Sequence, residues 1–136
     1  MTISIGQASS DDRAAAIGLW QECGLTRPWN DPGSDFDRAL AFEGSAIFIA
    51  ADQGTKVGTA MAGFDGHRGW IYYLGVVPAR RGEGIARSLI DACTDWLRQQ
   101  NCPKVELMLR TGNPASGLYE RLGWELQQVS VYALWL

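Results

Sequence analysis

Cysteine, histidine and long apolar runs are all scarce in this sequence. The three cysteines, Cys23, Cys93 and Cys102, are odd in number and far apart, so we expect neither a disulfide framework nor a metal site. No apolar stretch approaches the roughly 20 residues that cross a bilayer. The first residues also lack the basic flank and hydrophobic core of a secretion signal. These absences predict a cytoplasmic protein with no bound metal and no membrane partner.

An excess of basic residues is also missing. The chain has 12 lysines and arginines against 15 aspartates and glutamates, a net charge of -3. Surfaces that bind nucleic acid phosphates are basic, so no nucleic acid partner is expected. A length of 136 residues, of which 46% are hydrophobic and 20% charged, suits one ordinary core. We therefore expect residues 1–136 to form a single domain.

Hydrophobic periodicity predicts strands interspersed with helices. Strands are expected at residues 2–7, 45–52, 56–64, 70–77 and 104–110, with one or two closing strands within 124–136. Helices are expected at residues 9–24, at 35–42 with Ser34 as the capping residue, at 85–100 and within 113–123. Antiparallel hairpins with one strand–helix–strand crossover predict the α+β class, a sandwich around a mixed sheet.

The turn before the long helix combines arginine with glycine. Backbone N–H groups at a helix start have no intrahelical acceptor, and the helix dipole adds positive charge there. Glycine, without a Cβ, lets the backbone approach an anion closely. The spacing of Arg81, Gly84 and Ala86 therefore suits a phosphate or pyrophosphate cradle, with Arg80 adding charge. The alternative is a purely structural turn with two solvated arginines.

Two stretches of the chain resemble two sequence motifs of one protein family. The first is YYLGVVPARRGEGIARSLI at 72–90, and the second is NPASGLYERLGW at 113–124. They resemble two motifs of the GNAT superfamily of acetyl-CoA-dependent N-acetyltransferases: Arg/Gln-x-x-Gly-x-Gly/Ala after a strand ending in Val-x-Pro, and Asn-x-x-Ala-x-x-Leu-Tyr-Glu-x-x-Gly-Phe. The resemblance covers nearly the whole chain, and it is to the small, stand-alone bacterial members.

One displacement separates the second stretch from its motif. Counting back from Tyr119 places the family's asparagine position at Gly112, whereas Asn113 lies one place late. The resemblance thus implies a shortened loop before the last helix, with Asn113 as the candidate contact to the cofactor.

The resemblance implies a GNAT-like fold and a cofactor site. The fold would have a mixed, mostly antiparallel sheet, helices on both faces, and a cleft where the fourth and fifth strands splay apart, with Gly75 in the disturbed strand. The diphosphate of acetyl-CoA would bind the amides of residues 81–86, and its pantetheine arm would run beside residues 74–77. The implied cofactor-binding residues are Leu74, Val76, Val77, Arg81, Gly82, Gly84, Ile85, Ala86 and Asn113.

The resemblance also implies the chemistry, which is direct attack of a primary amine on acetyl-CoA. Tyr119 matches the family's general acid, whose phenol protonates the departing thiolate; its alternative role is packing beneath the cofactor. The strand position that often carries the base holds Met108, and Glu106 is the nearest substitute. A solvated Glu106, with water carrying the proton away, is the alternative.

The acceptor amine is expected near the segment RPWNDP, which follows the first helix. Trp29, Asp31 and Tyr72 are the candidate substrate contacts, and Asp31 with Asp35 could attract a cationic amine. The alternative is a capping loop with Trp29 in the core. Amine substrates of both kinds, small molecules and proteins, stay open.

Two other functions and one partner are compatible with the sequence. The chain could bind acyl-CoA as a sensor without catalysis, or act as an interaction module in which the Arg/Gly turn is structural. The apolar end, YALWL, could pair in a homodimer.

Overall fold

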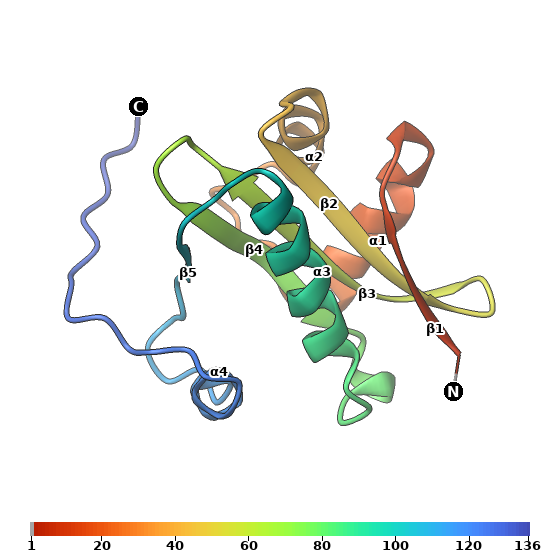
Figure 1. The fold of residues 1–136 in the computed structure, drawn as a ribbon. Coiled ribbons are helices and arrows are strands. Elements are labelled where there is room, and N and C mark those ends of the chain that lie inside the picture. The colour runs from red at the N-terminus through yellow and green to blue at the C-terminus, as the bar shows by residue number, and fades with distance from the viewer. Residues whose placement is uncertain (1) are drawn as a thin grey trace.

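A five-stranded sheet forms the centre of the computed structural model, which describes residues 2–136 (Figure 1). The strands, in sheet order, are β1 (Ile3–Gln7), β2 (Ser45–Asp52), β3 (Thr55–Phe64), β4 (Gly69–Val76) and β5 (Val105–Leu107). The pairs from β1 to β4 are antiparallel, and β4 pairs with β5 in parallel. The predicted mixed, mostly antiparallel sheet is confirmed.

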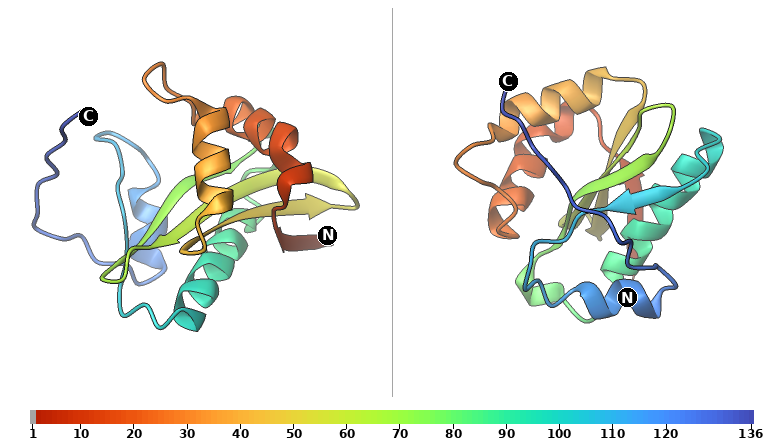
Figure 2. Two further views of the ribbon diagram at one scale, coloured as in Figure 1. Left: turned by 90° about the horizontal axis from the view of Figure 1, so that it is seen from above. Right: turned by 90° about the vertical axis from the view of Figure 1, so that its left-hand side faces the viewer.

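Helices cover both faces of the sheet, as predicted. The helices are α1 (Arg13–Glu22), α2 (Pro32–Ala41), α3 (Ile85–Gln99) and α4 (Ser116–Arg121). Figure 2 shows α1 and α2 on one side of the sheet and α3 on the other. The predicted first helix begins with a short 3-10 turn at Ser10–Asp12, which Ser9 caps.

The core is packed from these two sides. Trp20 of α1 and Phe36 of α2 are fully buried on one face. On the other face α3 buries one stripe, Ile85, Leu89, Ile90, Cys93 and Leu97, at the helical spacing that its sequence indicated. Burial of such apolar side chains is the main stabilising contribution to the fold.

A bulge in β4 opens the sheet. Thr59 pairs with Gly75 and Met61 with Tyr72, so two residues of β4, Tyr73 and Leu74, lie opposite one residue of β3. Tyr73 has a left-handed φ of 50°, which a bulky side chain rarely adopts. A bulge bends its strand and increases the twist. β4 consequently leaves β5 after the Ile71–Leu107 pair, the last in their ladder, and the predicted splayed cleft is confirmed.

Gly75 was expected in the disturbed strand, and it directly follows the bulge, which is formed by the two residues before it. Gly75 has a different reason to be glycine. A Cβ at this position would lie 2.8 Å from Leu25 Cδ1 and 2.9 Å from Cys23 Cβ. Only a residue without a side chain lets the segment after α1 approach β4 so closely.

The predicted bounds of two elements were wrong, and so was one further predicted element. α2 begins at Pro32 with Asp31 as its cap, not at Asp35 with Ser34, because proline is favoured in a first helical turn. β5 is limited to Val105–Leu107, since the chain diverges from β4 beyond it. No strand is found within 124–136 of the described chain, which is solvent-exposed from Glu125 onward. The alternating apolar residues of this segment form no ladder with a strand of the described sheet.

Candidate active site

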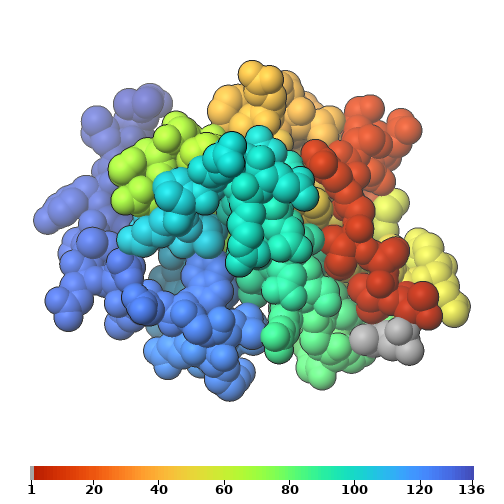
Figure 3. Space-filling view, in the orientation of Figure 1, coloured from red at the N-terminus to blue at the C-terminus, as the bar shows by residue number. Residues whose placement is uncertain are grey.

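A cleft of about 1560 Å³ opens where β4 and β5 diverge. Its walls come from the segment after α1, from α2, β4, the turn before α3, the residues after β5, and α4. In the space-filling view the surface is hollowed between the cyan residues after α3 and the blue α4 (Figure 3). The candidates that line this cleft are Trp29, Tyr72, Leu74, Val76, Arg81, Gly82, Gly84, Ile85, Ala86, Asn113 and Tyr119.

One end of the cleft is the turn before α3. Gly84 caps the helix with a φ of 83°, and Gly82 has a φ of 81°. No backbone N–H of residues 82–87 donates to an acceptor in the described part of the chain; the first that does is Ser88 N, to Gly84 O at 3.2 Å. A Cβ at either glycine would meet nothing within 4 Å, and Gly82, Gly84 and residues 85–87 line the cleft. The turn therefore presents a row of free donors to the cleft.

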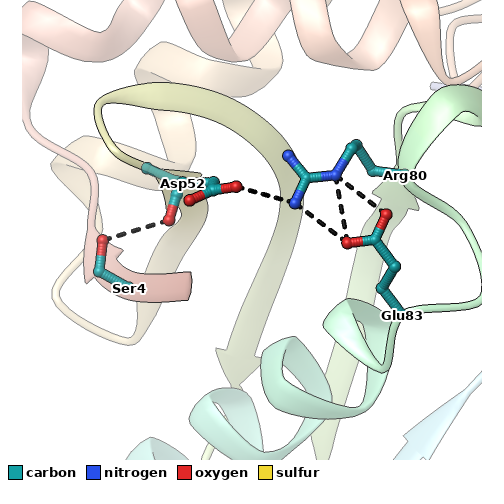
Figure 4. A network of polar contacts seen from close by, with 5 residues as sticks. Ser4, Asp52, Arg80 and Glu83 are labelled. Atoms are coloured by element: carbon teal, nitrogen blue, oxygen red, sulfur yellow. Dashed lines mark hydrogen bonds and ion pairs between the residues drawn. The ribbon is translucent and has the colours of Figure 1, made fainter. Parts of the chain in front are cut away.

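The two arginines of the turn have different roles, contrary to the expectation that both add charge. Arg80 Nη2 lies 2.9 Å from Asp52 Oδ2 and Nε lies 3.0 Å from Glu83 Oε2 (Figure 4). The hydrogen bond to Glu83, followed by the one to Asp52, raises the pKa of Arg80. Its charge is thus compensated, and it ties the turn to the end of β2.

Arg81 points elsewhere and is exposed. Its Nε donates to Val76 O at 3.1 Å, and none of the described carboxylates pairs with it. This bond holds the Arg81 side chain against the end of β4 and leaves its charge uncompensated among the described residues. Arg81 and Arg87 are therefore the cations available at this end of the cleft.

The cleft-facing edge of β4 lacks a strand partner beyond Ile71. Leu74 and Val76 line the cleft on this edge. Val77 does not: its N–H donates to Val57 O at 2.9 Å, and its side chain is buried in the core. An extended ligand could hydrogen-bond to the backbone groups of this open edge, as an additional strand would.

Tyr119 of α4 lies almost buried in the wall of the cleft, with 8% of its surface exposed. Its ring meets Trp124 edge-on, with the centroids 5.6 Å apart. Every fully buried side-chain oxygen in residues 2–136 has a hydrogen-bond partner. The Tyr119 hydroxyl has no such partner, so it is not fully buried and is accessible to solvent or a ligand. Burial raises the pKa of Tyr119, which keeps its phenol protonated at neutral pH.

Asn113, which lies one place late relative to the family motif, is in the segment that leads into α4. Its Oδ1 accepts a hydrogen bond from Ala115 N at 2.8 Å. The side chain thus shapes the turn before α4, and the residue also lines the cleft.

Two further predicted site residues, both carboxylates, also lie outside the cleft. Glu106 is on the paired part of β5, opposite Trp70, and its Oε1 is 3.7 Å from Arg68 Nε. Asp31 caps α2 by accepting from Gly33 N at 3.1 Å and Ser34 Oγ at 2.9 Å. The hydrogen bond from Ser34 is the largest cause of its lowered pKa. Neither carboxylate is positioned toward the ligand space.

The acceptor side of the cleft contains Trp29 and Tyr72, both partly exposed. Trp29 is 53% exposed and is not in the core. Arg110, from the segment after β5, lies over its ring with Cζ 5.6 Å from the centroid. Burial raises the pKa of Tyr72.

Asp35 is the one carboxylate that lines the cleft among the described residues. Both of its oxygens are engaged: Tyr73 OH donates to Oδ2 at 2.6 Å, and Arg38 Nη2 lies 2.6 Å from Oδ1. This contact between α2 and the bulge, and the arginines around it, were missed by the sequence reasoning. Their only signal was the composition of separate segments, which the fold brings together.

Two further searches of residues 2–136 gave negative findings. No three His, Cys, Asp or Glu side chains gather in a way that could hold a metal ion. No helix has the length and hydrophobicity that crossing a membrane requires.

Comparison with known proteins adds a family to this geometry. The model of the acetyltransferase (GNAT) family matches residues 14–124. An acetyltransferase of Pectobacterium atrosepticum is 47% identical over 116 residues, which are 85% of this chain and 82% of that protein. An acetyltransferase of Yersinia pseudotuberculosis is 46% identical over 118 residues, 86% of this chain and 84% of that protein.

Solved structures show the same fold at low identity. The aminoglycoside N-acetyltransferase AAC(6')-Iy, in complex with a bisubstrate analogue of CoA and acetylneamine, has a TM-score of 0.87 and 22% identity, with all of both chains covered. A predicted acetyltransferase from Clostridium acetobutylicum with acetyl-CoA has a TM-score of 0.84 and 17% identity, covering 98% of this chain and 96% of that one.

Proposed function

The chain belongs to the GNAT family of acetyltransferases, and we propose that it transfers the acetyl group of acetyl-CoA to a primary amine by direct attack. One observation carries the proposal. The N–H groups of residues 82–87 have no acceptor among the described residues, and all of these residues except Glu83 line the end of a cleft that the bulge in β4 opens.

The turn binds the diphosphate of acetyl-CoA. Free N–H groups at a helix start are anion donors, and the dipole of α3 adds positive charge. Arg81 and Arg87 add two guanidinium groups. The pantetheine arm extends along Leu74 and Val76, where the edge of β4 that faces β5 has no partner strand. Asn113 and Ala115 line the opposite wall.

Tyr119 supplies the proton for the leaving group. The amine nitrogen attacks the thioester carbon, the carbon–sulfur bond breaks, and the departing thiolate takes the proton of the Tyr119 hydroxyl. The nitrogen then loses one proton to water, and water returns a proton to the tyrosinate, so that Tyr119 is protonated again. The raised pKa of Tyr119 keeps the acid loaded at neutral pH.

Solvent is the base in this proposal. Asp35 has both oxygens bonded, and Glu106 lies outside the cleft. The amine therefore loses its proton to water, and the reaction uses the neutral form of the acceptor. The rate should rise with pH until the acceptor amine is fully deprotonated.

The engaged carboxylate of Asp35 favours a second candidate function. A cleft whose single carboxylate is engaged also suits a non-catalytic acyl-CoA sensor. Release of free thiol distinguishes the two functions: a transferase releases CoA only when an amine is present, whereas a sensor binds acetyl-CoA without releasing thiol in a panel of amines.

Calorimetry with acetyl-CoA tests the binding proposal. Gly84→Glu and Arg81→Glu place a carboxylate at the turn and should abolish measurable binding. Arg98→Glu, at the other end of α3, reverses a charge outside the cleft and is the matched control. Equal affinity in the wild type, Gly84→Glu and Arg98→Glu would reject the proposed site.

A further inference from the structure

The charges that line the cleft differ from those of the chain as a whole. The whole chain has 12 basic and 15 acidic residues. Among the described residues, those that line the cleft include six arginines and one aspartate, and no lysine or glutamate. The arginines are Arg27, Arg38, Arg80, Arg81, Arg87 and Arg110. A positive cleft in an acidic protein selects for anionic ligands.

The diphosphate of acetyl-CoA accounts for only part of this charge. Arg80 is compensated by Asp52 and Glu83, and Arg81 with Arg87 flanks the free N–H groups of the turn. The other three arginines come from the segment after α1, from α2 and from the segment after β5. Arg110 lies over the ring of Trp29, Arg27 is two residues before Trp29 in the sequence, and Arg38 pairs with Asp35.

Arg27 and Arg110 are held in place without a carboxylate partner. Arg27 Nη1 donates to Gly24 O at 2.9 Å and to Thr26 O at 2.8 Å. The Arg110 guanidinium lies over the Trp29 ring. None of the ion pairs among the described residues includes either arginine. Two oriented guanidinium groups without a counter-ion are suited to bidentate binding of a carboxylate or phosphate.

The described residues of the cleft provide no uncompensated carboxylate that could bind a cationic group of the acceptor. Asp35 is the cleft's only carboxylate in residues 2–136, and its oxygens already bind Tyr73 and Arg38. A second ammonium group on the acceptor would have to share this carboxylate with Arg38, which already compensates its charge. It would also lie among positive charges that repel it. Polycationic amines are therefore poorly matched to this site.

We propose that the acceptor is an amine that also carries an anionic group, a carboxylate or a phosphate, which Arg27 and Arg110 bind. The inference rests on the proposed acetyl transfer and names its substrate class. It also bears on the lack of a base. Positive charge close to the acceptor favours the neutral form of its amine, which is the form that attacks, so the arginines assist the deprotonation that no carboxylate performs.

Matched pairs of amines test the inference in a thiol-release assay. An amino acid is compared with its carboxamide, and an amino sugar phosphate with the unphosphorylated sugar; spermidine represents the polycations. We expect kcat/KM to be at least about tenfold higher for the anionic member of one pair. The pair that shows the preference identifies carboxylate or phosphate. Equal rates within both pairs, or spermidine as the best acceptor, would overturn the inference.

Two variants locate the anion. Arg110→Gln should raise KM for the preferred anionic acceptor about tenfold and leave KM for its neutral counterpart unchanged. Arg27→Gln should do the same, with thermal unfolding measured because Arg27 also bonds the main chain. Arg98→Gln, outside the cleft, is the control.

Calorimetry separates this inference from the proposed function. The affinity for acetyl-CoA should be the same in Arg110→Gln and the wild type. If Arg110→Gln instead weakens acetyl-CoA binding and spares the acceptor KM, the arginine belongs to the cosubstrate site, and the anionic-acceptor inference fails while acetyl transfer stands. Wild-type protein that does not bind acetyl-CoA would overturn both.

Discussion

The hydroxyl of Tyr73 donates a hydrogen bond to Asp35 Oδ2 at 2.6 Å, which ties the bulge of β4 to α2. The Tyr73 ring also stacks on Trp20, with the centroids 3.9 Å apart. These contacts stabilise a residue whose left-handed φ of 50° is unfavourable for tyrosine. Because the bulge separates β4 from β5, the contact with Asp35 helps to keep the cleft open.

Tyr73→Phe should therefore destabilise the fold by about 1.5 kcal/mol, the usual contribution of a hydrogen bond to a charged group. Chemical denaturation at neutral pH measures this loss. An unchanged free energy of unfolding would mean that the contact does not support the bulge.

The same tyrosine makes stability depend on alkaline pH. Burial, the largest cause, and the hydrogen bond to Asp35 raise the pKa of Tyr73 above its ordinary value of 10.0. The unfolded state loses the proton first, so the contribution of Tyr73 is complete below pH 10 and is lost as the pH rises toward the folded pKa. Wild-type protein should lose stability above pH 10 more steeply than Tyr73→Phe.

Gly84→Ala should reduce stability, and its cause is the backbone alone. A Cβ at Gly84 meets nothing within 4 Å, but its φ of 83° costs a non-glycine residue about 1–2 kcal/mol. Gly18→Ala is the matched control, because Gly18 lies inside α1 with open space around it. This change should stabilise the protein by roughly 0.5–1 kcal/mol. Opposite shifts in the free energy of unfolding are expected.

Tyr119→Phe should lower kcat about 100-fold, because a general acid commonly contributes at least that factor. Acetyl-CoA affinity should stay the same, and Tyr132→Phe in the exposed C-terminal segment is the control. A residue that only packs beneath the cosubstrate would instead give a normal kcat with a weaker binding constant.

Charge changes around Arg80 should act in opposite directions on acetyl-CoA binding. Arg80→Gln leaves Glu83 and Asp52 uncompensated beside the free N–H groups, so affinity should fall. Glu83→Gln removes one of these carboxylates, so affinity should be kept or increased. A loss of affinity in Glu83→Gln as large as that in Arg80→Gln would show that the ion pair matters for shape rather than charge.

The exposed C-terminal segment leads us to predict a homodimer. Its large apolar side chains are Leu126, Val129, Val131, Tyr132, Leu134, Trp135 and Leu136. Figure 1 shows this segment running past β5, the edge strand of the sheet. Each copy thus offers an apolar strand-length segment and an open edge to a second copy. Light scattering should give a dimer, and Val131→Lys with Leu134→Lys should give a monomer; a monomeric wild type would contradict this.

Much of the fold could be predicted from periodicity and turn chemistry. The stripe from Ile85 to Leu97 gave α3, and Pro78 with the glycines after it placed the turn correctly. The errors arose where a long-range partner decides the structure. The alternation in 124–136 indicates a strand, but a strand forms only when it pairs with another strand, and these residues pair with no strand of the described chain.

The candidate site shows the same division. The glycine pattern indicated the free N–H groups of the turn, because local geometry determines them. Compensation of Arg80 by Asp52, 28 residues away in the sequence, was not foreseeable. Glu106 was a reasonable base by strand position, and the early divergence of β5 from β4 left it outside the cleft.

Hydrogen exchange of the backbone amides of residues 82–87, with and without acetyl-CoA, tests the central claim most directly. These N–H groups have no acceptor among the described residues, so they should exchange rapidly in the free protein. Acetyl-CoA should slow their exchange strongly, while the amides of β1, on the far edge of the sheet, stay unchanged. Exchange at residues 82–87 that is equally fast with saturating acetyl-CoA would contradict the account.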